Sequence, residues 1–133
     1  MRVRFVGRMS TFGGPEDLGI RPDEGLALVD SSNFKLFSEY FLPEQPPGTT
    51  GLARRLNPNS FYIACRWDYR VTPRSLLVRS MVVVTNPGKL LTAEGKPIDW
   101  GPNVSTGRVA DLSPGLAQRL GLQTDDNVEV VLE

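Results

Sequence analysis

The sequence predicts a mainly β domain with short helices and many turns. Its 133 residues include 13 glycines and 11 prolines beside 40% hydrophobic residues, a balance typical of a turn-rich globule. Residues 2–12 alternate charged and apolar side chains with a period of two, which predicts an opening strand. A chain of this length has room for one hydrophobic core, so we expect a single domain over residues 1–133.

Less regular structure is expected after this strand. The glycines and proline of residues 13–15 end the strand, and residues 23–29 fit either a helical turn or, as we prefer, a turn followed by a short strand. Aromatic residues recur every three or four positions over 32–42 and predict a short amphipathic helix. Residues 43–50 are rich in proline and predict a loop inside the domain, because the segment before them is too small to bury its own core.

The second half of the chain carries most of the expected sheet. Aromatic and β-branched runs predict three strands, at 61–67, 76–85 and 127–132, of which 76–85 is the strongest. Residues 86–88 have the composition of a turn. A loop or irregular hairpin is expected at 89–96, ahead of a short apolar segment at 98–100.

The clearest helix is predicted at residues 114–120. Ser113 fits the N-cap, and Pro114 fits the first helical position, where its missing N–H costs nothing. Arg119 lies in the expected last turn, and Gly121 follows as a stop signal.

Composition excludes several classes of function. The sequence has no histidine and one cysteine, Cys65, so Ser–His–Asp and Cys–His nucleophile schemes and an intrachain disulfide are excluded. We expect neither a metal nor a cofactor, and acid–base chemistry would fall to carboxylates, Lys, Tyr or Cys65. Fifteen basic residues balance fifteen acidic ones, and no glycine-rich phosphate loop occurs, so nucleic acid and nucleotides are not expected partners.

The sequence also sets an expectation for location. The N-terminus interleaves charges with apolar residues and lacks the apolar core of a secretory signal. No apolar run approaches the roughly 20 residues of a membrane helix. We therefore expect a soluble protein without membrane insertion, which acts outside a cell only after export or release by other means.

Residues 97–122 contain four short motifs in one order. They are Asp99-x-Gly101-Pro102, Gly107-Arg108-Val109, Asp111-Leu112-Ser113 and Leu120-Gly121. In order and spacing they resemble the rare lipoprotein A family, which is related to the expansins and to glycoside hydrolase family 45. Residues 82–86 and 10–13 also resemble strands of this family, so the resemblance covers 61–133 and, with fewer matches, 8–14.

The resemblance implies a fold and a function. The fold would be a six-stranded double-psi β-barrel, with residues 15–60 as an insertion after the first strand. The function would be cleavage of a cell-wall polysaccharide, peptidoglycan in the first place, by a lytic transglycosylase-like or glycosidase-like reaction. Where the family has Ala-His, this sequence has Ala64-Cys65. Two non-catalytic alternatives therefore stay open: an expansin-like glycan binder, or a structural module with protein partners in a phage or secretion assembly.

Site residues follow from the same resemblance. Asp99 would be the acid/base and Asp111 the second carboxylate, provided that the barrel crossover brings them across one groove. Substrate binding is assigned to a further set: Thr11, Phe12, Trp100, Asn103 and Arg108.

Structural explanations compete with some of these assignments. Asp99 would brace the Gly101-Pro102 turn, and Asp111 would stabilise the start of the following helix. Trp100 fits core packing slightly better than sugar stacking, and Trp67 fits the core. Cys65 fits a buried, inert thiol.

Overall fold

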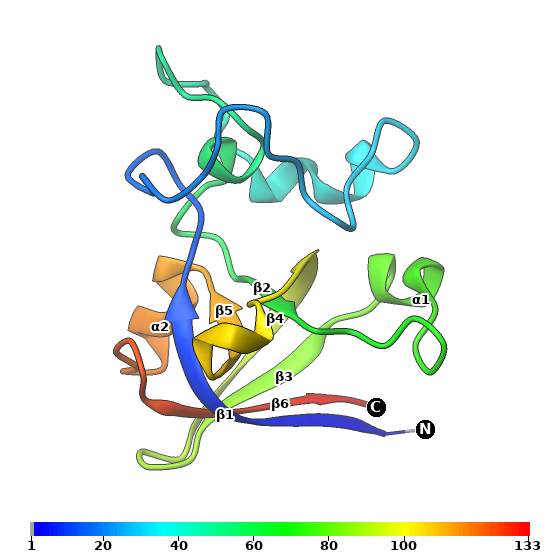
Figure 1. The fold of residues 1–133 in the computed structure, drawn as a ribbon, viewed down its shortest axis with the longest axis vertical. Coiled ribbons are helices and arrows are strands. Elements are labelled where there is room, and N and C mark those ends of the chain that lie inside the picture. Colours follow the sequence, from blue (N-terminus) through cyan, green and yellow to red (C-terminus); the bar gives the residue numbers. More distant parts are fainter. Residues whose placement is uncertain (1) are drawn as a thin grey trace.

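Six strands close into a barrel in the computed structural model, which describes residues 2–133 (Figure 1). The strands are β1 (Val3–Thr11), β2 (Tyr62–Cys65), β3 (Val82–Asn86), β4 (Leu91–Trp100), β5 (Arg108–Leu112) and β6 (Asn127–Leu132). Around the barrel they follow the order β1-β5-β2-β4-β3-β6. The expected mainly β barrel with an insertion after its first strand is confirmed.

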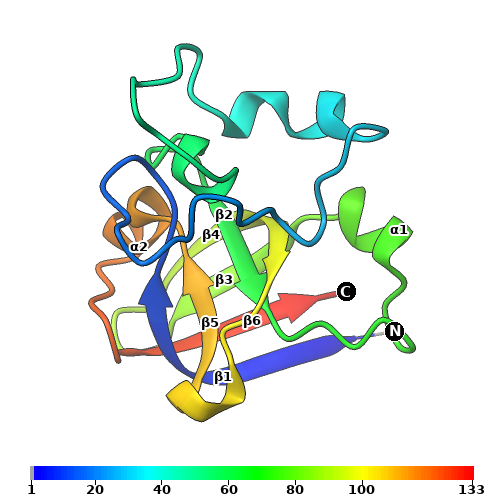
Figure 2. The same cartoon turned by 45° about the horizontal axis from the view of Figure 1, so that its top comes forward.

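The barrel contains two parallel strand pairs, and these produce an internal two-fold symmetry. β1 pairs with β5 and β2 with β4 in parallel, whereas all other neighbours are antiparallel. If β1, β2 and β3 are exchanged with β4, β5 and β6, respectively, the order around the barrel stays the same, read in the opposite direction. Each parallel pair also has one register shift, between Arg8 and Met9 and between Ile63 and Ala64. The two crossovers bring β4 and β5 to the two sides of β2, as Figure 2 shows.

The barrel interior is filled by the alternating apolar side chains of the strands. Val82 and Val84 of β3 and Val128 and Val130 of β6 are fully buried, with exposed or half-buried residues between them. This period of two is what a sheet with one buried face requires. Leu116 of helix α2 (Pro114–Arg119) is also fully buried among them.

Helix α2 has the caps that the sequence predicts. The Ser113 hydroxyl accepts a hydrogen bond from the Leu116 N–H at 3.1 Å, and Pro114 occupies the first turn. Gly121 follows the helix with a φ of 65°, in the left-handed region that favours glycine. The predicted helix at 114–120 is confirmed to within a residue.

The predicted strand at 76–85 is wrong in its first half. Helix α1 (Arg74–Val78) occupies that part, and β3 begins only at Val82. The cause is a distant contact: the buried Lys96 ammonium donates hydrogen bonds to the carbonyl oxygens of Val78 and Ser80. A cation stabilises the end of a helix there, and the local pattern of β-branched residues cannot reveal it.

Three other local predictions also need correction. Residues 89–90 complete the turn after β3, and residues 91–96 open the ten-residue strand β4, which pairs along β3 from Asn86 to Val82. No strand forms at 23–29, where the chain turns and Leu28 donates its N–H to the Ile98 carbonyl. The helix expected at 32–42 is the 3₁₀-helix η1 (Phe34–Tyr40).

The segment between β1 and β2 covers one end of the barrel, as the blue, cyan and green ribbon in Figure 1 shows. It carries η1 and a second 3₁₀-helix, η2 (Ala53–Arg55). Leu28, Phe37 and Leu56 of this segment are fully buried in the same hydrophobic core as the barrel residues. The segment is therefore packed on the barrel and can contribute to a site at that end.

Gly13, where β1 leads into this segment, cannot carry a side chain without strain. Its φ is 89°, and a Cβ atom there would collide with the Tyr62 hydroxyl. We expect Gly13→Ala to lower the free energy of unfolding by about 1–3 kcal/mol. Urea denaturation measures the change, with Gly25→Ala as the matched control because nothing lies within 4 Å of a Cβ at that position. Equal effects in the two variants would contradict this account of the turn.

Candidate functional site

Asp99 and Asp111 lie in one row across the sheet, although twelve positions separate them in the sequence. Ala64 on β2 pairs with Asp99 on one side and with Asp111 on the other. Ser10 on β1 pairs with Asp111 and extends the row. Two strand spacings separate the Cα atoms of the two aspartates, about 10 Å. The crossovers of the barrel thus produce a proximity that the sequence alone does not contain.

Both aspartates line one cavity of about 380 Å³, here called the acid groove. The barrel contributes Asp99, Trp100, Asp111 and the loop 101–103. Phe12 and the insertion residues Asp17, Gly19, Ile20 and Glu24 form the rest of the lining. The groove therefore lies between the end of the barrel and the insertion that covers it.

The carboxylate of Asp99 is held on one side and free on the other. Its Oδ1 accepts hydrogen bonds from the N–H groups of Ala27 and Trp100, both at 2.8 Å. Burial raises the pKa of Asp99, the two N–H donors act against that rise, and the charge of Glu24 adds to it. Asp99 therefore braces the insertion through Ala27, and Oδ2 makes no hydrogen bond within the described chain.

Asp111 has the more strongly shifted carboxyl group. Its pKa is raised to about 6, chiefly by burial and also by the negative charges of Asp99 and Asp17, while the charges of Arg108 and Arg66 oppose the shift. The residue belongs to β5, and α2 begins three positions later with its own Ser113 cap. Asp111 thus holds a proton in weakly acidic solution, as a general acid must.

The two neighbouring arginines are engaged elsewhere. Arg108 forms a two-pronged ion pair with Asp125, with Nε to Oδ1 at 2.9 Å and Nη2 to Oδ2 at 3.3 Å. Arg66 donates from Nη1 to the carbonyl oxygens of Pro102 and Arg108, both at 2.7 Å. Neither side chain lines the acid groove, so the structure does not bring Arg108 together with the other predicted substrate-binding residues.

Of the other predicted substrate-binding residues, three line the groove and Thr11 does not. Trp100 is 45% exposed, so the slight preference for core packing at this residue is wrong. Its Nε1 donates to the Trp67 carbonyl at 2.9 Å, which fixes the ring at the groove. Phe12 packs edge-to-face on Tyr62 with centroids 5.2 Å apart.

Asn103 lies in the loop that follows β4. Its Oδ1 accepts the Ser105 N–H at 2.9 Å and caps the 3₁₀-helix η3 (Val104–Thr106). The amide nitrogen of Asn103 is not used in that contact, so it can donate to a ligand in the groove.

Trp67 and Cys65 are both predicted to lie in the core. Trp67 is 3% exposed and donates its Nε1 to the Asp99 carbonyl at 2.9 Å, so its assignment to the core is confirmed. Cys65 is fully buried, and burial raises the pKa of its thiol. The thiol is therefore inert, as expected.

Sequence reasoning missed the two acids that the insertion brings to the groove, Asp17 and Glu24. Asp17 is fixed by the N–H groups of Gly13 at 2.8 Å and Gly19 at 3.1 Å. The pair Gly13 and Asp17 is a local turn signal, but nothing in the spacing indicates that this turn faces β5. Only the packing of the insertion on the barrel reveals these residues.

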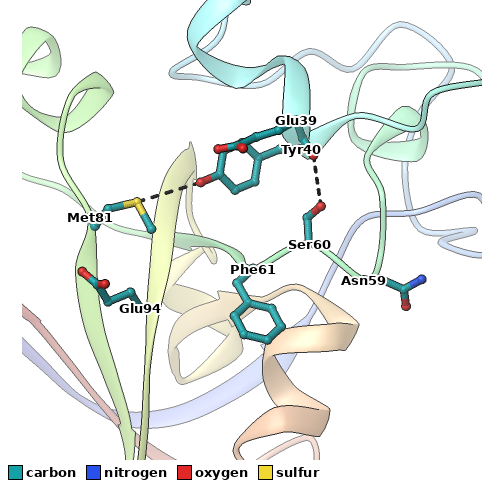
Figure 3. Close-up of a pocket in the computed structure, with 7 residues that line it drawn as sticks. All are labelled: Glu39, Tyr40, Asn59, Ser60, Phe61, Met81 and Glu94. Atoms are coloured by element: carbon teal, nitrogen blue, oxygen red, sulfur yellow. Dashed lines mark hydrogen bonds between the residues drawn. The ribbon is translucent and has the colours of Figure 1, made fainter.

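A second hollow, of about 390 Å³, lies against η1, residues 59–61, Met81 and β4 (Figure 3). Figure 3 shows the Tyr40 hydroxyl pointing toward the Met81 sulfur, 3.9 Å away, with Glu39 and Glu94 nearby. Burial raises the pKa of Tyr40 to about 12, so this hydroxyl keeps its proton. The hollow shares no lining residue with the acid groove.

Among residues 2–133, no group of three or more Asp, Glu, Cys or His side chains is close enough to hold a metal ion. None of the helices in that range has the length and apolar character needed to cross a bilayer.

No protein-family model matches the chain, and no curated protein matches it either. Its function is therefore inferred from the geometry and chemistry of the groove.

Proposed function

We propose that the protein cleaves glycosidic bonds of a cell-wall polysaccharide, peptidoglycan in the first place, by acid–base catalysis in the acid groove. The observation that carries this proposal is the placement of Asp99 and Asp111 in one groove, with the pKa of each carboxyl raised by burial. The resemblance of residues 97–122 to rare lipoprotein A supports the same reaction class. Glycoside cleavage needs an acid beside the glycosidic oxygen and, for hydrolysis, a second carboxylate.

The two aspartates exchange the roles that the resemblance implies. Asp111, with a pKa of about 6, donates its proton to the glycosidic oxygen as the bond to the anomeric carbon breaks. Asp99 accepts a proton through Oδ2 from the attacking water, whose oxygen forms the new bond to the anomeric carbon. Hydrogen bonds from Ala27 and Trp100 keep Asp99 oriented during this step.

The spacing of the pair indicates the stereochemistry. Asp99 and Asp111 lie two strands apart and not on neighbouring strands, which favours the roughly 6.5–9.5 Å carboxyl separation of inverting enzymes over the shorter one of retaining enzymes. That separation leaves room for the water. A hydroxyl of the sugar itself can replace the water as nucleophile, and the product is then the internal anhydro sugar of a transglycosylase-type reaction.

The direct test uses purified sacculi and mass spectrometry. We expect soluble fragments to appear at weakly acidic pH, and their mass distinguishes hydrolysis, which adds one water, from internal attack, which adds none. Fragment release equal to that of buffer across the range from acidic to neutral pH would contradict the proposal.

The rate should depend on pH through the proton on Asp111. Because the acid must be protonated, we expect kcat/KM to fall as pH rises through about 6. The charges that face Asp111 are those of Asp99, Asp17, Arg108 and Arg66, of which the first two raise its pKa. A pH–rate profile for release of a labelled fragment measures this fall in kcat/KM. A rate that stays constant from pH 5 to pH 8 would contradict the role of Asp111.

A non-catalytic glycan binder is the second candidate, and one observation favours it. Asp99 is already engaged by two N–H groups, whereas Trp100 presents an exposed indole at the groove that can stack on a sugar ring. A binder without activity sediments with insoluble peptidoglycan or cellulose and releases nothing. A structural module with protein partners only stays in the supernatant.

A further inference from the structure

The lining of the acid groove is strongly anionic. Four carboxylate side chains line it, Asp17, Glu24, Asp99 and Asp111, and no lysine or arginine does so within residues 2–133. The net charge of the whole protein is zero, so the groove concentrates negative charge in one place.

Nearby cations neutralise this lining only in part, because the charges of Arg108 and Arg66 act on Asp111 although neither side chain lines the groove. The guanidinium group of Arg108 forms its ion pair with Asp125, outside the groove. Arg66 donates to two backbone carbonyls. Arg54, in η2 of the insertion, donates a hydrogen bond to the Pro15 carbonyl at 2.9 Å.

The insertion supplies half of these charges in a fixed position. Both oxygens of Asp17 accept backbone N–H bonds, from Gly13 and Gly19, which orients the carboxylate. Glu24 accepts the Arg21 N–H at 3.2 Å. Trp100 lines the same groove, and its exposed indole offers an apolar face with negative potential, which also attracts cations.

We infer that the acid groove selects an amino-sugar polymer with free, protonated amino groups over the same polymer in N-acetylated form. Asp17 and Glu24 are the specificity-determining residues, because each offers a carboxylate to an ammonium group beside the sugar-stacking face of Trp100. This inference rests on the proposed function and names its substrate class. Two sources carry the chemistry: a glucosamine polymer, and peptidoglycan whose glucosamine units lack their acetyl groups.

The same charges disfavour other glycans. Uronic acids and the carboxylates of intact stem peptides would meet the negative charges of Asp17, Glu24 and Asp99, and such like-charge contacts weaken binding. An N-acetyl group carries no charge and would leave the carboxylates of the insertion without a partner. The charges of the groove therefore weaken the binding of acidic polymers and favour the binding of deacetylated ones.

Calorimetric titration with glucosamine oligomers and with N-acetylglucosamine oligomers of equal length tests the inference. At low salt and weakly acidic pH, we expect the free-amine oligomer to bind about tenfold more tightly, since a hydrogen bond to a charged group contributes that much. The advantage should shrink at high salt, which screens exposed charges. It should be lost in the double variant Asp17→Asn, Glu24→Gln.

A matched variant controls for net charge. Glu16→Gln removes an exposed charge next to Asp17 but outside the groove lining, and should keep the tenfold preference. Circular dichroism checks the fold of each protein, and if Asp17→Asn unfolds, Glu24→Gln alone should reduce the preference. Equal affinities for the two oligomers, or a preference that persists without both carboxylates, would overturn the inference.

The outcomes also separate this inference from the proposed function. Release of fragments from normally acetylated sacculi, with no gain on chemical deacetylation, overturns the amine preference and leaves glycan cleavage standing. Faster release from deacetylated sacculi supports the inference and identifies deacetylated peptidoglycan as the source of the amino groups. Cleavage of the glucosamine polymer alone also supports the inference and identifies that polymer as the source. Absence of binding and cleavage with every polymer overturns both.

Discussion

Asp111→Asn should lower the rate of glycan cleavage by about 10²–10⁴-fold and, at neutral pH, make the protein more stable. The asparagine has the shape of the carboxyl group but no proton to donate to the glycosidic oxygen, so the general-acid contribution is lost. The gain in stability arises because burial disfavours the ionised carboxylate that the native protein must carry at neutral pH.

The sign of the stability change follows from proton binding. Between the ordinary carboxyl pKa of about 4 and the native value of about 6, the folded protein binds more protons than the unfolded chain, so stability falls as pH rises through that window. Removing the group abolishes this loss, and we expect a gain of about 1–3 kcal/mol at pH 7 and little change at pH 4. Thermal unfolding at both pH values and the sacculus assay measure the two effects.

Asp68→Asn is the matched control for this experiment. Asp68 is outside the groove, and its contact with Arg70 lowers its pKa, the opposite direction to Asp111. Its replacement should leave cleavage unchanged and bring no gain in stability at neutral pH. An Asp111→Asn protein that cleaves at the normal rate would remove the residue from the mechanism.

Two variants of Asp99 should separate its structural role from its chemical role. Asp99→Asn keeps an Oδ1 acceptor for the N–H groups of Ala27 and Trp100 but loses the base, so we expect about a 10²-fold or greater loss of activity at nearly normal stability. Asp99→Ala leaves both N–H groups without their acceptor and should also lose about 1–3 kcal/mol of stability.

Urea denaturation and the cleavage assay on both variants give the answer. If Asp99→Asn were fully active and only Asp99→Ala were impaired, Asp99 would be a brace for the insertion and not a base. If instead both variants were inactive but only Asp99→Ala were destabilised, both roles of the residue would be supported.

The local elements with self-contained signals could be predicted from the sequence. The alternation in residues 2–12 and the caps of Ser113, Pro114 and Gly121 depend on neighbours in the chain, and the structure agrees with them. The first half of segment 76–85 was predicted wrongly because the ammonium of Lys96, 16 and 18 positions from the carbonyls it binds, stabilises the end of α1. Strand β4 was largely missed because Gly95 and Pro97 disguise it, although Gly95 pairs with Val82 of β3 and Pro97 pairs with Ile63 of β2.

The groove was predictable only in part, for a similar reason. Asp99, Asp111, Trp100 and Phe12 lie in or next to recognisable motifs, and all four line the groove. Asp17 and Glu24 come from a segment with no recognisable motif, and their proximity to β5 depends on how the insertion packs. Arg108 lies within a motif, yet its pairing with Asp125 holds it away from the groove lining.

The protonation of Asp111 is the physical basis of the proposed reaction, and a carbon NMR titration of its carboxyl group measures it most directly. The shared groove should give an apparent pKa near 6 in the native protein. That value should move down in Asp99→Asn, because the neighbouring negative charge is gone. A pKa near 4, unaffected by the replacement of Asp99, would show that the two carboxyl groups lie apart in ordinary solvent, and acid catalysis in this groove would be excluded.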